Sequence, residues 1–330
     1  MTTAAHWHAL ETAQVACDLC PVDCHLRPGQ TGPCGTRANE NGVMVPLHYG
    51  RIVSSAVDPI EKKPLYHFHP GRSILSVAAP GCNLHCLFCQ NWSISQERTV
   101  TTVPVTPDDL VAQAQALGSL GIAFTYSEPL VWFEFVRDTA EAARAAGLKN
   151  VLVTNGYLNP EPLAELLPLI DAANIDLKSM DDGFYRDVCR ASLDPVLHTI
   201  RQAKAAGVHL ELTNLVIPGY NDRADQIGRL VDFVADLDPE TPLHFSAYRP
   251  AWKLKARPTT VDDLLRARAI AERKLPWVYL GNVVTDQGRD SQCPDCSQLL
   301  VRRAGYRAEV KTGAGPQCEG CGRKLPFILT

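Results

Sequence analysis

The chain has 330 residues, 45% of them hydrophobic, and a net charge of −4 at neutral pH. This length allows one barrel-sized domain with appendages or roughly two to three small domains. The slightly negative charge excludes a global basic field that would attract nucleic acid or an anionic membrane. The sequence contains no apolar stretch as long as a membrane span and no secretory pattern, so we expect a cytoplasmic protein.

The N-terminal segment, residues 1–50, contains four closely spaced cysteines among glycines and prolines. Cys17, Cys20, Cys24 and Cys34 are candidate metal ligands in a loop-rich knuckle. Four thiolates suit tetrahedral zinc or an auxiliary iron–sulfur cluster. Their spacing matches neither a bacterial ferredoxin run nor two C-x2-C knuckles. Zinc, a cluster and structural thiols without metal therefore all stay open.

Residues 43–68 lead from this segment to the central domain. Weak alternation over residues 43–56 predicts a small hairpin before the core. Two prolines in the following stretch, residues 58–68, exclude a regular helix. The charged residues of that stretch fit either an ordinary solvated loop or the mouth of a site.

An apolar run over residues 74–79 predicts a buried strand that leads into three cysteines. Cys82, Cys86 and Cys89 have the spacing C-x3-C-x2-C. A four-iron cluster normally takes four cysteine ligands, so three cysteines leave one iron open. An open coordination position distinguishes a catalytic metal site from a closed structural one. A closed zinc site or a buried thiol cluster is the alternative.

Strands and helices alternate from here to residue 284. We predict strands over residues 121–126, 150–154, 173–177, 209–217, 243–247 and 277–283. We predict helices over residues 106–117, 130–146, 195–206 and 222–237, with others starting at residues 159 and 260. This alternation indicates βα units and a parallel sheet. Because an eight-unit barrel needs about 250 residues, we expect an α/β fold with an incomplete (β/α)6-type parallel barrel over residues 51–284.

The active site of such a barrel lies at the carboxyl ends of its strands. Polar residues gather near these predicted ends, and each alone would be an ordinary loop start. The set comprises Thr125, Tyr126, Ser127, Glu128, Thr154, Asn155, Asp176, Lys178, Glu211, Thr213, Asn214, Tyr220, Asn221, Asp222, His244, Ser246, Tyr248 and Arg249. The series predicts a site at one rim of the barrel. Cys189, alone on a predicted helix, is typical of a small buried hydrophobic residue.

The C-terminal module, residues 285–330, contains two C-x2-C knuckles. Cys293, Cys296, Cys318 and Cys321 predict a zinc-ribbon or rubredoxin-like site for zinc or iron. So short a segment builds little core, so we expect the metal to supply its folding free energy. The basic side chains of the module are typical of a solvated face, and nucleic acid is not an expected partner.

The three central cysteines, with Phe88 before the last one, resemble the cluster loop of the radical S-adenosylmethionine (SAM) superfamily. The resemblance implies a [4Fe-4S] cluster on Cys82, Cys86 and Cys89. It further implies that the amino and carboxylate groups of SAM chelate the open iron. An electron passed through the cluster then cleaves the sulfonium and yields a 5′-deoxyadenosyl radical.

The same resemblance implies which residues contact SAM. Glu128 matches the acidic motif near the SAM amino group, although Tyr-Ser-Glu replaces the usual Gly-Gly-Glu. Asp176 and Lys178 resemble the Asp-x-Lys of glycyl-radical-activating enzymes, where the lysine would pair with the SAM carboxylate. The full set implied to bind the cofactor is Phe88, Glu128, Asn155, Asp176, Lys178 and Asn214.

Motifs along almost the whole chain are similar to the AmmeMemoRadiSam-system radical SAM enzymes, relatives of pyruvate formate-lyase activating enzyme. They include Asp-Pro-Ile-Glu-Lys-Lys-Pro-Leu, Thr-Tyr-Ser-Glu-Pro and Pro-Gly-Tyr-Asn-Asp. The resemblance implies an electron donor and a Memo-like partner, and it supplies no substrate. We expect hydrogen abstraction from an unknown substrate. The alternatives are activation of a glycyl radical enzyme and a non-catalytic metal scaffold whose ribbon binds nucleic acid or protein.

Overall fold

The computed structural model describes residues 3–311 and 317–329 of the chain. Its central feature is an eight-stranded sheet with the order β15-β14-β13-β12-β11-β10-β8-β7. Neighbours from β8 to β15 pair in parallel, whereas β7 pairs antiparallel with β8. These strands are β7 (Ser54–Pro59), β8 (Ser73–Ala78), β10 (Gly121–Phe124), β11 (Lys149–Thr154), β12 (Ala172–Asp176), β13 (His209–Val216), β14 (Leu243–Ala247) and β15 (Val278–Gly281).

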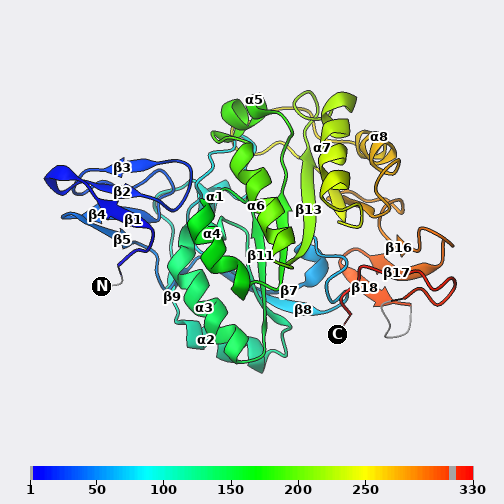
Figure 1. The fold of residues 1–330 in the computed structure, drawn as a ribbon, viewed down its shortest axis with the longest axis horizontal. Coiled ribbons are helices and arrows are strands. Elements are labelled where there is room, and N and C mark those ends of the chain that lie inside the picture. The colour runs from blue at the N-terminus through cyan, green and yellow to red at the C-terminus, as the bar shows by residue number, and fades with distance from the viewer. Residues whose placement is uncertain (1–2, 312–316, 330) are drawn as a thin grey trace.

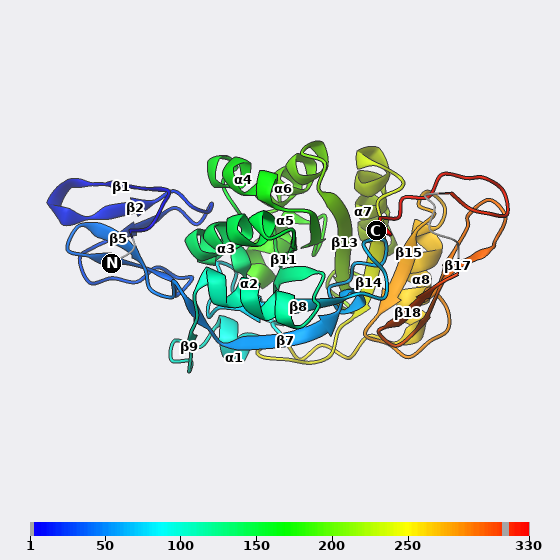
Figure 2. The same cartoon turned by 90° about the horizontal axis from the view of Figure 1, so that it is seen from below.

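Helices connect the parallel strands. Capping boxes at Thr106 and Thr260 start α2 (Pro107–Ala116) and α8 (Val261–Ala271), because each hydroxyl accepts the backbone N–H three residues on. The others are α1 (Trp92–Ser95), α3 (Phe133–Ala145), α4 (Pro160–Leu166), α5 (Asp182–Phe184), α6 (Asp194–Ala205) and α7 (Ala224–Leu237). Figure 2 shows α3, α4 and α6 along one side of the sheet. The predicted α/β fold with a parallel sheet is confirmed, whereas closure as a partial barrel stays a prediction.

The N-terminal strands lie at one end of the molecule (Figure 1). β1 (Trp7–Ala9), β2 (Val15–Cys17) and β3 (Cys24–Leu26) form an antiparallel sheet, and β4 (Arg37–Glu40) pairs with β5 (Val43–Pro46). The hairpin predicted over residues 43–56 is wrong. Residues 43–46 form β5, which pairs with the preceding strand β4. The next strand, β6 (Arg51–Ile52), pairs with β9 (Val103–Pro104). Residues 54–59 join the main sheet as β7 because their alternating exposure suits an antiparallel edge strand.

The C-terminal module lies at the opposite end of the molecule (Figure 1). β16 (Ser291–Gln292), β17 (Leu299–Ala304) and β18 (Arg307–Val310) form an antiparallel sheet, which contains the predicted hairpin. Arg303 of β17 is fully buried, and its guanidinium lies 4.1 Å from the ring centre of Tyr66 and donates to the Tyr66 carbonyl at 2.7 Å. Leu300 and Val301 share a small core with Tyr66 and Tyr279 of β15. The module is therefore packed against the central domain.

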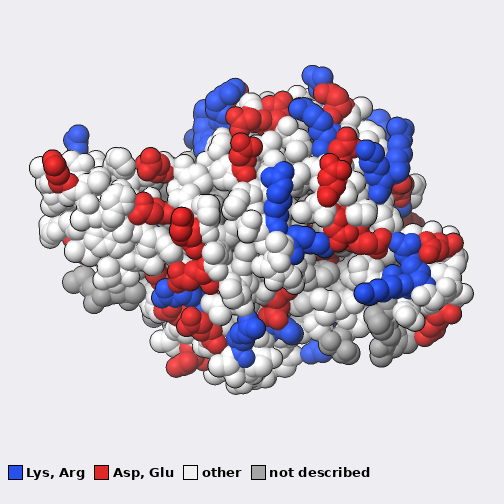
Figure 3. Space-filling model, in the orientation of Figure 1, with Lys and Arg blue, Asp and Glu red and all other residues white. Residues whose placement is uncertain are grey.

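Charged side chains of both signs are interspersed over the central part of the face in Figure 3. This distribution agrees with the small net charge of the whole chain. Within residues 3–311 and 317–329, no helix is long and apolar enough to cross a membrane. The domain boundaries at residues 50 and 284 stay predictions.

Candidate active site

A cavity of about 430 Å³ lies where the parallel strands end, and all three central cysteines line it. Cys82, Cys86 and Cys89 follow β8 directly, in a loop that turns at Gly81 with a φ of 99°. This left-handed conformation favours glycine. Most of the other lining side chains come from the ends of several parallel strands, and Phe88, Lys62 and Tyr306 come from other segments. The lining side chains include Phe88, Lys62, Thr125, Tyr126, Ser127, Glu128, Thr154, Asn155, Asp176, Lys178, Thr213, Leu215, Ser246, Asn282 and Tyr306.

The cysteine loop is held by a short π-helix, Tyr185–Cys189, which includes the residue that the sequence placed on a helix. The backbone N–H of His85 donates to the carbonyl of Cys189 at 2.9 Å, and that of Leu87 donates to Val188 at 2.9 Å. Cys189 is fully buried, as predicted. Its thiol also bonds to Cys86, and this contact contributes most to lowering the pKa of Cys86. Cys189 therefore supports the loop, a role that its isolated position in the sequence did not indicate.

Glu128 is the most fully hydrogen-bonded carboxylate of the cavity. Its Oε1 accepts bonds from Thr154 Oγ1 at 2.6 Å and from the Leu130 N–H at 3.0 Å. Its Oε2 accepts from the Asn155 N–H at 2.8 Å. Burial raises the pKa of Glu128 to about 7, against the lowering effect of these three bonds. Thr154 and the start of the next loop thus fix an acid at the cavity wall.

Lys178 and Asp176, which also line the cavity, form an ion pair with Nζ and Oδ2 2.8 Å apart. Burial alone lowers the pKa of Lys178, but Asp176 and the sulfur atoms of Cys86 and Cys189 raise it well above its usual value. The ammonium also lies 5.9 Å from the ring centre of Phe88. Lys178 therefore places a fixed positive charge beside the cysteine loop.

Two asparagines among the predicted contacts occupy different positions. Asn155 lines the cavity, and its Nδ2 lies 3.6 Å from Cys82 Sγ. Asn214 has its amide bonded to the carbonyls of Leu177 at 2.8 Å and Lys178 at 3.1 Å. Thr213 and Leu215, on either side of it, line the cavity instead. Successive residues of a strand point to opposite faces, which explains the difference.

Two polar residues of the predicted rim belong elsewhere. Glu211, near the start of β13, is fully buried and accepts the backbone N–H groups of Tyr66 and His67 at 3.0 and 2.7 Å. His244 Nε2 lies 2.6 Å from Glu211 Oε2. The prediction that Glu211 and His244 belong to the rim is wrong, because both lie near the amino ends of their strands. They instead hold residues 66–67 against the sheet.

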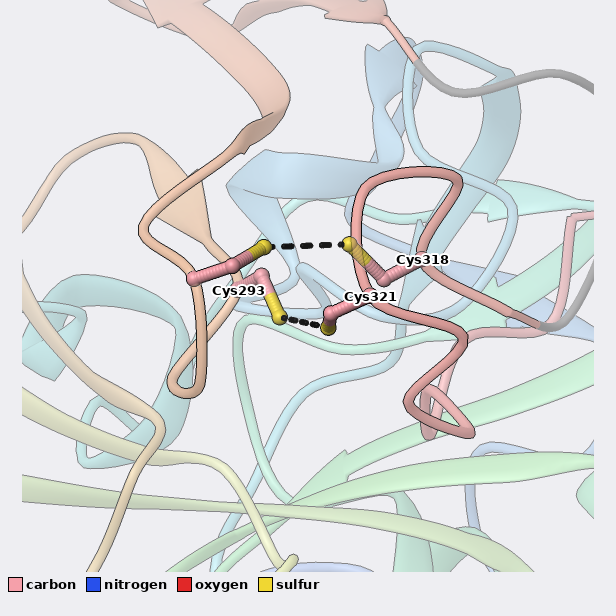
Figure 4. Close-up of side chains that lie close together, drawn as sticks. Cys293, Cys318 and Cys321 are labelled. Carbon is pink, nitrogen blue, oxygen red and sulfur yellow. Dashed lines mark hydrogen bonds between the residues drawn. The ribbon is translucent and has the colours of Figure 1, made fainter.

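The four C-terminal cysteines converge on one point, as Figure 4 shows for three of them. The Sγ atoms of Cys293 and Cys321 are 3.6 Å apart, and those of Cys296 and Cys318 are 3.5 Å apart. All four lie within 4.8 Å of one another. A tetrahedral zinc with bonds of about 2.3 Å brings its sulfurs to roughly 3.8 Å, so this group can bind a metal ion.

The N-terminal cysteines surround a separate, small cavity. Cys17, Cys20, Cys24 and Cys34 all line it, together with Arg37. Burial raises the pKa of Cys20 and of Cys24 to about 12. The cysteines predicted from the sequence therefore lie in three separate groups, of which the central one lines the large cavity.

A sequence profile of the radical SAM superfamily matches residues 76–234. An uncharacterized protein of Methanocaldococcus jannaschii is 43% identical over 339 residues and is matched over the full length of both chains. The pyruvate formate-lyase 1-activating enzyme of Escherichia coli K12 is 28% identical over 182 residues, covering 53% of this chain and 74% of that enzyme.

The fold is also found in a solved structure. Streptococcus suis SuiB bound to S-adenosylmethionine superimposes with a TM-score of 0.51 at 18% identity, covering 64% of this chain and 52% of that chain. The cysteine loop and the cavity-lining residues from Cys82 to Leu215 lie inside the matched profile. The chain is an enzyme that belongs to the radical SAM superfamily, and it is homologous to pyruvate formate-lyase activating enzymes.

Proposed function

We propose that this enzyme holds a [4Fe-4S] cluster on Cys82, Cys86 and Cys89 and uses it to cleave SAM reductively. The resulting 5′-deoxyadenosyl radical abstracts a hydrogen atom from a substrate that is still unknown. The observation that carries the proposal is the placement of three cysteines, without a fourth from the same loop, on the wall of a cavity of about 430 Å³. Typical ligand pockets measure about 300–1,000 Å³.

The chemistry of the donor set fits this cofactor. Three thiols suit a four-iron cluster with one open iron, and the residues around them are polar and charged. When bound, the cluster supplies the single electron that divides SAM into methionine and the radical. The protein must bind, orient and shield these groups.

Two opposite charges on the cavity wall suit the two ends of an amino acid. Glu128, held by Thr154 and Asn155, would accept hydrogen bonds from the SAM ammonium. Lys178 would pair with the SAM carboxylate, and Asp176 keeps the Lys178 ammonium in position. Phe88 contributes an apolar face beside Lys178. Asn155, near Cys82, completes the set, and Asn214 supports the rim from behind.

Activation of a glycyl radical enzyme is the second candidate. The activating enzymes of pyruvate formate-lyase from Escherichia coli and of benzylsuccinate synthase from Thauera aromatica favour it, at 28% and 24% identity. Each covers little more than half of this chain, with 53% and 56%. Superfamily membership favours either radical reaction over the scaffold hypothesis. A Memo-like partner and membership of the AmmeMemoRadiSam group stay predictions from the sequence.

We propose zinc at the C-terminal site, because sulfurs 3.5–3.6 Å apart match the zinc geometry. Rubredoxin-type iron is the alternative at the same four thiols. The metal would stabilise the module that packs on Tyr66 and contributes Tyr306 to the cavity. The metal site therefore supports one wall of the active site.

The test is an anaerobic assay of the enzyme reconstituted with iron and sulfide. SAM and a strong reductant are added, and 5′-deoxyadenosine is quantified by chromatography. We expect product from the parent enzyme and none from the Cys82→Ala, Cys86→Ala, Cys89→Ala variant. Absence of product from a parent that contains a full cluster would overturn the proposal. Adding a peptide from a glycyl radical enzyme then separates the two candidates, because only an activase forms a stable glycyl radical on it.

A further inference from the structure

The N-terminal cysteines differ in geometry from the zinc-like group at the C-terminus. Among the described residues, Cys293, Cys296, Cys318 and Cys321 form the only group of three or more ligand side chains whose ligand atoms all lie within 4.8 Å. Neither the N-terminal cysteines nor Cys82, Cys86 and Cys89, all within the described part of the chain, form such a group. A four-iron cluster separates its cysteine sulfurs by on the order of 6 Å, since the irons lie between them. Four thiols that hold a four-iron cluster therefore enclose a wider space than four thiols that hold a zinc ion.

The N-terminal thiols line a space of this kind. Cys17, Cys20, Cys24 and Cys34 line a cavity of about 20 Å³, which is enough for a water-sized sphere. A tetrahedral zinc brings its four sulfurs almost into contact and leaves no such space between them. The remaining wall is mostly apolar, with one buried guanidinium. Arg37, 1% exposed, donates from Nη1 to Cys17 Sγ at 3.7 Å.

The N-terminal site also contacts the radical SAM loop directly. The backbone N–H of Cys82 donates to the carbonyl of Cys34 at 3.2 Å, so one hydrogen bond joins a ligand candidate of each site. Gly81 makes this approach possible, because a Cβ there would lie 2.4 Å from the Cys34 oxygen. Asn83 lines the N-terminal cavity and accepts a bond at 3.0 Å from Asn155, which lies beside Cys82.

We propose that Cys17, Cys20, Cys24 and Cys34 bind a second [4Fe-4S] cluster, which relays electrons to the radical SAM loop through the Cys34–Cys82 hydrogen bond. A low-potential one-electron carrier, such as a reduced ferredoxin or flavodoxin, loses one electron and reduces this cluster by one. Transfer of that electron to the Cys82 site returns the N-terminal cluster to its oxidised form. The relay depends on the proposed function, whereas binding of the second cluster does not.

The first experiment counts metals in the Cys82→Ala, Cys86→Ala, Cys89→Ala variant, purified without oxygen from cells supplied with iron and zinc. We expect about four irons and four acid-labile sulfides per chain from the N-terminal cluster. The C-terminal metal adds no sulfide, so sulfide identifies the cluster. On reduction, a cluster signal in electron paramagnetic resonance should appear and should not change with SAM. Zinc without sulfide in this folded variant would overturn the proposal, whatever the activity of the parent.

The second experiment tests the relay with Gly81→Ala. Its matched control is Gly147→Ala, where a positive φ of 76° brings the same backbone strain but no atom lies within 4 Å of the added Cβ. With both clusters confirmed by iron and sulfide content, freeze-quench resonance spectra follow reduction of the SAM-responsive cluster by reduced flavodoxin. We expect slower reduction in Gly81→Ala alone. Equal rates in the parent and both variants would exclude the Cys34–Cys82 route.

Discussion

Thr154 at the end of β11 donates its hydroxyl to Glu128 Oε1 at 2.6 Å, linking the ends of two neighbouring strands across the cavity wall. Glu128 is only 3% exposed, and three hydrogen bonds leave its carboxylate one orientation. The pKa of about 7 that burial gives Glu128 means that its charge responds readily to a bound cation.

Glu128→Gln should weaken SAM binding. Loss of a hydrogen bond to a charged group costs about 1.5–3 kcal/mol, which corresponds to roughly 10–100-fold in the dissociation constant. Equilibrium dialysis of the anaerobic enzyme measures it. A SAM analogue without the amino group should bind the parent and the variant with equal affinity, because this analogue has no ammonium to bond to Glu128 in either protein. An unchanged affinity for SAM would exclude Glu128 as the ammonium partner.

The Lys178→Met variant should lose the tighter binding of SAM relative to SAM without its carboxylate. Its ammonium is paired with Asp176 and is 11% exposed, so a bound carboxylate would meet a largely desolvated charge. We expect the parent to bind SAM more tightly than decarboxylated SAM, and the variant to lose most of this difference. Asp176→Asn serves as the matched control, since it keeps the Lys178 ammonium but removes the carboxylate charge that pairs with it. A variant that keeps the full preference contradicts the assigned role.

Asp58→Asn should destabilise the fold in a pH-dependent way. Burial alone raises the pKa of Asp58, but hydrogen bonds from Lys62, Lys63 and Tyr126 lower it below its usual range. Lys63 is 1% exposed, and removing its partner leaves an unpaired buried charge that costs about 3–5 kcal/mol. The folded pKa lies below the unfolded one, so this stability is present above the unfolded pKa and is lost as the pH falls through the folded pKa.

Chemical denaturation at several pH values measures the effect. Between about pH 6 and pH 3, the parent should lose more free energy of unfolding than Asp58→Asn, because only the parent must protonate this carboxylate. Asp225→Asn is the control. Its carboxylate is 55% exposed and pairs with Arg223, so the change should stay within about 0.5 kcal/mol. Parallel pH profiles of the parent and Asp58→Asn would contradict the assignment.

Removal of the C-terminal metal should unfold the module and uncover one edge of the central domain. The Ile328 N–H donates to the His67 carbonyl at 2.8 Å, and Arg303 donates to the Tyr66 carbonyl. In the Cys296→Ser, Cys321→Ser variant, hydrogen exchange should accelerate over residues 291–310 and 66–69 while β10 and β11 stay protected. Arg302→Ala, on the exposed face of the same strand, should change neither region. Unchanged protection after metal loss would show that packing alone folds the module.

The sequence predicted the parallel sheet, the three cysteine groups and most of the cavity wall, because alternation and cysteine spacing are local signals. It did not predict β7, because Asp58 and Pro59 at its end are typical of a loop and the pairing with β8 is not visible in the sequence. Asn214 shows a second limit. Successive residues of a strand point to opposite faces, so an error of one residue exchanges a residue that lines the cavity, such as Thr213, for one that supports it from behind, such as Asn214. Tyr306 shows a third, because the packing of Arg303 on Tyr66 brings a distant module to the cavity.

The most direct test of the central claim is a measurement of SAM at the open iron of the Cys82, Cys86 and Cys89 cluster. Electron–nuclear double resonance of the reduced enzyme with SAM labelled at its amino nitrogen and carboxylate carbon reports direct coupling to the cluster. We predict coupling to both labels in the parent, and none in the Cys82→Ala, Cys86→Ala, Cys89→Ala variant. A parent that contains the full cluster, binds SAM and yet shows no coupling would contradict chelation at this site.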